Sequence, residues 1–127
     1  MLPRQLGVVM ITVSDMERAV HFYRDVLGLP LRFESPNWTE FDTETVTLAL
    51  HSGGTPRSAL PAEGPPSAGS VSTGWYVKEL DATCATLKER GVRFIMEPTT
   101  REGEGIRLAV FLDPDGCALS LAQRINQ

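Results

Sequence analysis

The sequence predicts an α+β fold made of two modules that share the same βαβββ order of elements. A strand, a capped helix and a second strand occupy residues 8–31, and a weaker copy of this pattern occupies residues 72–94. Further short strands follow in each half, and a stretch rich in Gly, Pro and Ser separates the halves. Because the order of the elements matches as well as their types, the pattern indicates an internal duplication.

The first module begins with a run of β-branched and apolar residues at 8–13, which is typical of a buried strand. Ser14 then predicts a helix cap, and Glu17 three residues later completes a capping box. Gly28 can adopt left-handed backbone angles and is expected to end the helix. The apolar stripe at helical spacing consists of Met16, Val20, Tyr23 and Leu27.

Turn residues divide the rest of the first module into three predicted strands. These strands span residues 29–34, 38–41 and 45–51. Residues 53–70 show no periodicity and predict a linker or a mobile loop. We therefore expect one structural domain with modules at residues 1–52 and 71–127.

The second module repeats the order with a helix at residues 80–90 and a loop at 97–105. Its predicted strands span residues 71–77, 92–96, 106–112 and 117–123. This loop is polar and contains glycine, so it is either an ordinary surface loop or one that closes over a ligand.

The turn at residues 113–116 fixes the register of the last hairpin. Pro114 cannot adopt a positive φ, so a type I′ turn is excluded. A type I turn followed by Gly116 as a left-handed bulge residue fits the sequence. This turn predicts two cross-strand pairs, Val110 with Ser120 and Leu108 with Ala122.

Composition narrows the classes of function. The net charge is −4 and no basic stripe is present, so nucleic acid is not an expected partner. No apolar run reaches the roughly 20 residues that a membrane span needs, and the N-terminus lacks the core of a signal peptide. We expect a cytoplasmic protein in which Cys84 and Cys117 are free thiols.

Two sequence segments, VSDMERAVHFYRDVLGL and FLDPDGCALSL, lie within the repeated βαβββ pattern. Together they resemble the vicinal oxygen chelate superfamily, which includes glyoxalase I, extradiol dioxygenases and bleomycin-resistance proteins. The resemblance covers nearly the whole chain. It implies that each module curls a mixed sheet and that the two sheets together enclose a cavity.

The resemblance also implies where metal ligands would lie, because metal-dependent members carry a His or Glu on up to four inner strands. The matching positions here are Val8, Leu48, Ser72 and Ser120. Aliphatic side chains and neutral hydroxyls are not normal ligands for divalent metals. We therefore expect neither a metal nor another cofactor. His51 is an alternative ligand, although alternation from Leu48 points it to the opposite face.

Strand alternation predicts which side chains line the cavity. The wall is mostly apolar with a few hydroxyls and is typical of a pocket for a flat or hydrophobic molecule. The alternative is that these residues only fill a core. The candidate ligand-binding residues are Val8, Met10, Trp38, Leu48, Leu50, Ser72, Tyr76, Leu108, Val110 and Ser120.

Trp38 is the candidate for stacking on an aromatic ligand, since an indole can cover a ring and still donate its N–H. A sheet-edge or dimer contact is the alternative. Tyr76 is the candidate acid–base residue inside the cavity. Charged side chains in or next to the strands are candidates for its rim: Glu34, Glu40, Asp42 and Arg107.

Three functions follow from these residues. The first is a metal-free protein of the bleomycin-resistance type, which is not an enzyme and sequesters or carries a hydrophobic or aromatic compound, as in antibiotic resistance. The second is a metal-independent lyase or isomerase that uses Tyr76 and a rim carboxylate. The third is a metalloenzyme or dioxygenase-like protein with relocated ligands, including His51. The resemblance implies a homodimer for the first.

Overall fold

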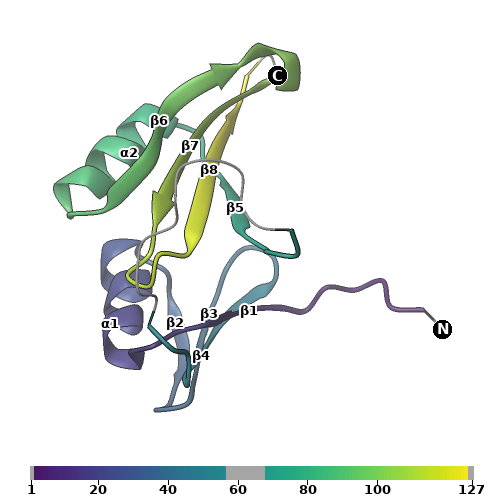
Figure 1. Cartoon of the computed structure of the whole chain (residues 1–127). Coiled ribbons are helices and arrows are strands. Elements are labelled where there is room, and N and C mark those ends of the chain that lie inside the picture. The colour runs from purple at the N-terminus through teal and green to yellow at the C-terminus, as the bar shows by residue number, and fades with distance from the viewer. Residues whose placement is uncertain (1, 57–67, 126–127) are drawn as a thin grey trace. The chain divides into compact units, whose positions relative to one another are not determined.

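The computed structural model describes residues 2–56 and 68–125. The chain forms two compact units, residues 1–57 and 58–127. Each unit contains a four-stranded mixed sheet with a helix on one face, which confirms the predicted fold class (Figure 1). Most of the predicted linker at 53–70 lies outside the described residues.

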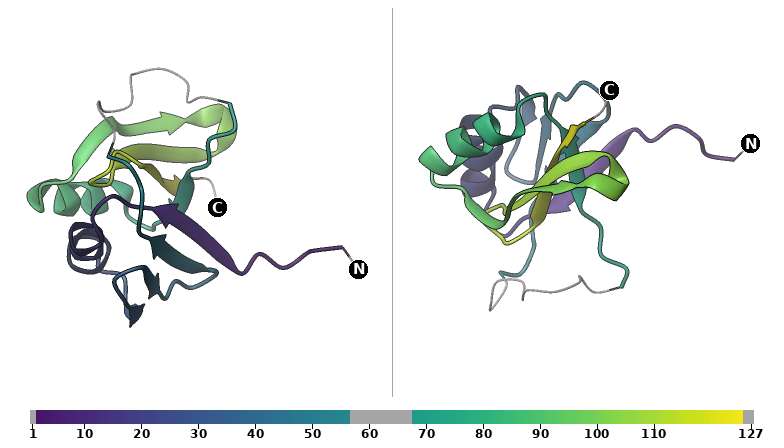
Figure 2. Two further views of the ribbon diagram at one scale, coloured as in Figure 1. Left: turned by 60° about the horizontal axis from the view of Figure 1, so that its bottom comes forward. Right: turned by 90° about the horizontal axis from the view of Figure 1, so that it is seen from above.

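The first unit has the strand order β1-β4-β3-β2. Strands β1 and β4 pair in parallel, and the other neighbours pair antiparallel. Residues 2–7 extend from the start of β1 without regular structure (Figure 2). The elements are β1 (Val8–Thr12), α1 (Met16–Val20), η1 (His21–Val26), β2 (Leu31–Glu34), β3 (Trp38–Phe41) and β4 (Thr47–His51).

The N-cap of the first helix is one residue later in the chain than predicted, at Asp15 instead of Ser14. Asp15 is the N-cap, because its backbone is extended and its carboxylate accepts a hydrogen bond from the Arg18 amide at 3.1 Å. Ser14 instead accepts a hydrogen bond from the Arg18 side chain. The second half, η1, is a π-helix, and the chain leaves it through Gly28 at a φ of +80°, as predicted.

The helix packs on one face of the first sheet, which we call the covered face. Tyr23 lies 6.1 Å from Phe41 between ring centroids, and neither side chain is exposed. The Thr39 hydroxyl contacts the sulfur of Met16 at 3.4 Å. The opposite side of the sheet is the first open face. Alternating residues of β3 therefore divide between the two faces, with Thr39 and Phe41 covered.

The strand pairing corrects the prediction for Leu48 and Leu50. Leu48 pairs with Phe41 and Leu50 with Thr39, so both leucines lie on the covered face and are buried. The prediction that they share a face with Val8 and Met10 is therefore wrong. Ala49 between them is also buried, and three consecutive buried residues give no alternation from which the sequence could reveal the face.

The second unit has the strand order β5-β8-β7-β6, with β5 and β8 parallel. The elements are β5 (Thr73–Tyr76), α2 (Leu80–Glu89), β6 (Arg93–Arg101), η2 (Glu102–Glu104), β7 (Ile106–Leu112) and β8 (Ala118–Arg124). Figure 2 shows β6 and β7 as a long twisted hairpin.

Strand β6 is longer than predicted. Thr99, Thr100 and Arg101 pair with β7 and belong to the sheet, although the sequence predicted a loop from residue 97. Two features explain the difference. The threonines are β-branched, and Pro98 is tolerated because β6 is an edge strand. The remaining turn is short, so the prediction of a loop over residues 97–105 is wrong.

The last hairpin has the predicted turn and register. Gly116 has a φ of +84° and donates its N–H to the Asp113 carbonyl at 2.9 Å. The buried Asp113 carboxylate accepts hydrogen bonds from the amides of Asp115 and Cys117. Val110 pairs with Ser120 and Leu108 with Ala122, which confirms both predicted pairs.

Helix α2 defines the covered face of the second sheet. Phe94 and Phe111 pack with ring centroids 5.7 Å apart, and Lys88 of α2 lies over Phe94. The Gln123 side chain accepts a hydrogen bond from the Leu80 amide at 2.8 Å, which satisfies a donor at the start of the helix. The opposite side is the second open face.

The two faces of the last hairpin predict opposite outcomes for two substitutions. Leu121 is 5% exposed on the covered face, so Leu121→Asp buries an unpaired charge and should lower the free energy of unfolding by about 3 kcal/mol or more. Val110→Phe adds its ring on the second open face and should leave stability within about 1 kcal/mol. Urea unfolding followed by circular dichroism measures both. The reverse ranking would contradict the assigned faces.

Candidate functional site

The first open face presents a mixture of exposed apolar side chains and polar groups. Because Met10 pairs with Ala49 and Thr12 with His51 in parallel strands, these residues share this face. Met10 is 61% exposed, which is unusual for a large apolar side chain within a strand. The face consists of Val8, Met10, Thr12, Arg32, Phe33, Trp38, Glu40, Thr47, Ala49 and His51.

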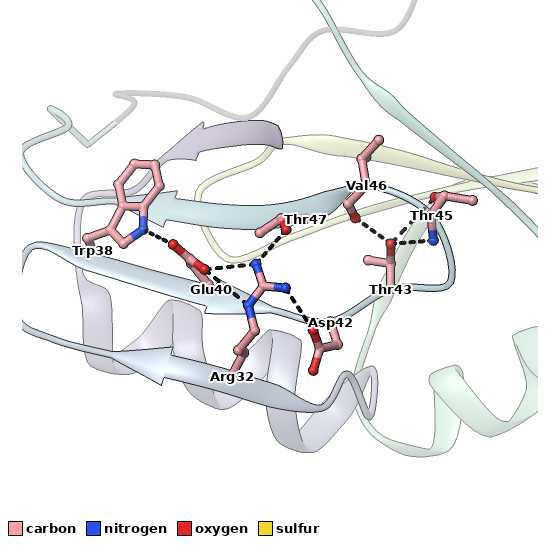
Figure 3. A network of polar contacts seen from close by, with 8 residues as sticks. All are labelled: Arg32, Trp38, Glu40, Asp42, Thr43, Thr45, Val46 and Thr47. Atoms are coloured by element: carbon pink, nitrogen blue, oxygen red, sulfur yellow. Dashed lines mark hydrogen bonds and ion pairs between the residues drawn. The ribbon is translucent and has the colours of Figure 1, made fainter. Parts of the chain in front are cut away.

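A polar network crosses this face from β2 to β4 (Figure 3). Arg32 donates two hydrogen bonds to Glu40, at 3.1 and 2.8 Å, and one to Asp42 at 3.0 Å. It also donates to the hydroxyl of Thr47. We call Arg32, Glu40, Asp42 and Thr47 the Arg32 cluster. Its ion pairs hold a half-exposed guanidinium in a fixed position on the open face.

The indole of Trp38 is attached to one end of this cluster. Its Nε1–H donates to Glu40 at 2.8 Å, while Ser35 and His51 contact the residue from other sides. The His51 ring meets the indole edge-on with centroids 6.1 Å apart. The indole N–H is therefore already used, and a ligand can contact Trp38 only through its ring. The indole N–H does donate a hydrogen bond, as expected, and its acceptor is the Glu40 carboxylate.

His51 is on the first open face, whereas the sequence argument pointed it away from the metal-ligand positions. That argument took Leu48 as the reference, and Leu48 itself is on the covered face. His51 therefore shares a face with Val8. The prediction that His51 and Leu48 point to opposite faces was correct, but the prediction that Leu48 lies on the open face was wrong.

The second open face is also largely apolar. Val110 pairs with Ser120 and Tyr76 with Ala122. Their side chains point away from the face that carries the covered Phe111 and Leu121. The register also places the predicted Leu108, and Gly74, on this face. Ser72 is exposed and precedes β5.

Tyr76 is 66% exposed and is covered on one side by a cation. The Arg124 guanidinium lies 3.8 Å from the centroid of its ring, which is the geometry of a cation–π contact. Arg107, in contrast, points to the covered face and forms an ion pair with Asp81 of α2 at 2.9 Å. The prediction that Arg107 reaches the rim of a cavity is therefore wrong.

The positions that the resemblance assigns to metal ligands do not fit a divalent metal. Val8 pairs with Thr47 rather than with Leu48, so the first sheet offers one aliphatic side chain and one hydroxyl there. The Ser120 hydroxyl donates to the Thr73 carbonyl at 3.4 Å. Neutral hydroxyls and aliphatic carbons lack the carboxylate, imidazole or thiolate donors that such metals require.

Across residues 2–56 and 68–125, no three His, Cys, Asp or Glu side chains form a group that could hold a metal ion. Within the same residues, no helix is both long enough and apolar enough to span a membrane.

Arg32 and Thr47 were missed by the sequence argument. The β-bulge between Leu31 and Phe33 shifts the register of β2, so simple alternation could not place Arg32. One signal was present, because Trp38 and Glu40 are two residues apart in a strand and must share a face. That spacing could have predicted their contact.

Comparison with known proteins assigns the family. The model of the Glyoxalase/Bleomycin resistance protein/Dioxygenase superfamily matches residues 5–121. The chain therefore belongs to this superfamily. The resemblance noted from the sequence is confirmed, and the superfamily match by itself does not choose among the three functions.

Three similar proteins represent the matches. Protein YraH of Bacillus subtilis, which is uncharacterized, is 28% identical over 84% of this chain and 88% of its own length. A probable lactoylglutathione lyase of Synechocystis sp. is 27% identical, covering 90% of this chain and 91% of its own. The crystal structure of TnmS3, an antibiotic binding protein from Streptomyces sp. CB03234, is 26% identical with a TM-score of 0.75 and covers 98% of both chains.

The Arg32 cluster predicts a defined pH dependence for Trp38. Hydrogen bonds from the Trp38 indole and from Arg32 lower the pKa of Glu40 below its usual range. The folded pKa is depressed, so the stabilisation is present above the unfolded value of about 4.3 and is lost as pH falls through the folded value. A Trp75→Phe, His51→Gln background leaves Trp38 as the one indole and removes the imidazole beside it. In this background, Trp38 fluorescence should stay constant from pH 8 to about pH 4.3 and change only below it.

Glu40→Gln is the control for this titration, because the amide still accepts from the indole but does not ionise in this range. The acid transition should then be absent before unfolding. A Trp38 transition well above pH 4.3 that Glu40→Gln leaves in place would contradict the assignment.

Proposed function

We propose that this protein is a metal-free binding protein for a hydrophobic or planar aromatic small molecule, with a role in sequestration or carriage. The observation that carries the proposal is the character of the two open faces. They present large exposed side chains: Met10 and Tyr76 on strands where metal-dependent relatives are expected to carry ligands, and Phe33 on β2. Exposed apolar groups within sheets are typical of binding surfaces.

The ligand-binding residues that we propose lie on both open faces or next to them. On the first sheet they are Val8, Met10 and Trp38. On the second they are Ser72, Tyr76, Leu108, Val110 and Ser120. Leu48 and Leu50 are left out because they are buried under the helix. The similarity to an antibiotic-binding protein supports the proposal, although at 26% identity it does not identify a ligand.

We further propose that the protein is a cytoplasmic homodimer, as the resemblance to the bleomycin-resistance type implies. Light scattering coupled to size exclusion would give twice the mass of one chain. A monomer at all concentrations used for ligand binding would contradict this part of the proposal.

A lyase or isomerase is the second candidate function. It is supported by the similarity to the probable lactoylglutathione lyase and by the exposed phenol of Tyr76 on the second open face. In this reaction Tyr76 would move a proton, so turnover to lactoylglutathione would be lost in Tyr76→Phe. A ligand that is bound and released unchanged favours the binding protein instead.

The binding function predicts affinity for a neutral planar probe. Acridine at pH 8, where it is neutral, should bind with a Kd of about 10 μM to 1 mM, as expected for a small apolar ligand that lacks specific polar contacts. Calorimetry and acridine fluorescence measure this. Met10→Asp or Val110→Asp should weaken binding about tenfold.

Glu102→Lys, in the exposed turn at η2, is the control substitution and should leave acridine affinity unchanged. Equal loss of affinity in all three variants would indicate a nonspecific effect. Absence of acridine binding up to its solubility limit would contradict the proposed function.

A further inference from the structure

The Arg32 cluster places unequal charge beside an aromatic ring. It contains one guanidinium and two carboxylates, those of Glu40 and Asp42, so it carries one net negative charge at neutral pH. The Glu40 carboxylate is held against the edge of the Trp38 indole by the 2.8 Å hydrogen bond (Figure 3). A molecule that stacks on this indole therefore lies close to the Glu40 carboxylate.

The hydrogen bond also increases the attraction of the indole for a cation. An aromatic face attracts positive charge through its quadrupole, and tryptophan does so more strongly than phenylalanine or tyrosine. An anionic acceptor at Nε1 adds electron density to the ring and adds its own Coulomb attraction. Both effects favour a positively charged ligand over a neutral or an anionic one.

Another exposed aromatic side chain of the open faces, Tyr76, already has a cation of its own. Arg124 covers Tyr76, and on the covered face Lys88 lies over Phe94. Among the described residues, no Lys or Arg forms such a contact with Trp38. Trp38, the strongest acceptor of cations among these three rings, therefore lacks an internal cation, and its N–H donates to the Glu40 carboxylate of a cluster with one net negative charge.

Arg32 has a positioning role in this arrangement. It holds Glu40 through two hydrogen bonds and fixes the carboxylate that orients the indole. Asp42, directly after the end of β3, and Thr47 of β4 in turn hold Arg32. The indole is thus held in one orientation before any ligand arrives, which lowers the entropic cost of stacking.

We propose that Trp38, with the Glu40 carboxylate at its Nε1 and Asp42 further along the same cluster, is a binding site for a planar aromatic cation, and that this charge cluster determines the specificity of the protein. This inference rests on the proposed function and names the ligand class for the first open face. Glu40 supplies the selecting charge, Trp38 the stacking surface, and Arg32 the positioning of both.

Three acridines of the same ring size and different charge provide the test. At pH 8 and low salt, the cationic 9-aminoacridine should bind at least about fivefold more tightly than neutral acridine, and acridine-9-carboxylate should bind most weakly. Raising the salt to about 0.5 M should reduce this preference, because exposed charges are screened. Fluorescence polarisation of the dyes gives all three affinities in the same buffer.

Two substitutions distinguish the charge of Glu40 from its positioning by Arg32. Glu40→Gln keeps an acceptor for the indole N–H but removes one negative charge, so the preference for the cation should fall to less than about twofold. Arg32→Gln leaves two carboxylates without their cation, so the preference for the cation should rise. Because Glu40 also loses the two hydrogen bonds that position it, the affinity for neutral acridine should fall. Thermal unfolding verifies that both variants are folded at the temperature of the titration.

The matched controls come from a second ion pair and a second tryptophan. Asp81→Asn and Arg107→Gln change the comparable pair on α2 and β7, and Trp75→Phe changes an indole that donates to Thr73 instead of a carboxylate. None of these should alter the order of the three dyes. Trp38→Leu should abolish the preference.

Two results would overturn the inference in distinguishable ways. If all three acridines bind with the same affinity and Glu40→Gln changes nothing, the charge cluster does not select the ligand, while the proposed binding function remains. If none of the three binds, the proposed function and the inference both fail.

Discussion

The parallel pairing between the first and last strands of each module is the constraint on which the rest of the structure depends. It aligns Val9 with Leu48 in the first sheet and Trp75 with Leu121 in the second. A slip of one residue would exchange the faces of every side chain in a strand. The register therefore decides both what the helices bury and what the open faces present.

The sequence predicted the second module better than the first, for a physical reason. In the last hairpin, Pro114 and Gly116 restrict the turn so strongly that the register follows from backbone angles alone. In β4 no such turn exists, and the run Leu48-Ala49-Leu50 is buried throughout. The faces of β4 become clear only from its partners, whose pairing involves residues that are distant in the sequence.

The same distinction explains which parts of the candidate site could be predicted. The mostly apolar second open face and Trp38 as an aromatic candidate followed from alternation and residue type. The Arg32 cluster did not, because it joins three strands across a β-bulge. The cap at Asp15 and the end of β6 could not be predicted to the residue, because neighbouring residues suit a cap or a strand end almost equally well.

We propose that this member of the superfamily binds its ligand without a metal, and a metal titration is the decisive experiment. Protein treated with a chelator should be titrated with Ni²⁺, Zn²⁺, Mn²⁺ and Fe²⁺ by calorimetry. We expect no binding tighter than about micromolar, or about −8 kcal/mol, because Val8, Thr47, Ser72 and Ser120 offer no suitable donors. Tight binding of one metal per chain, lost in His51→Ala, would contradict it.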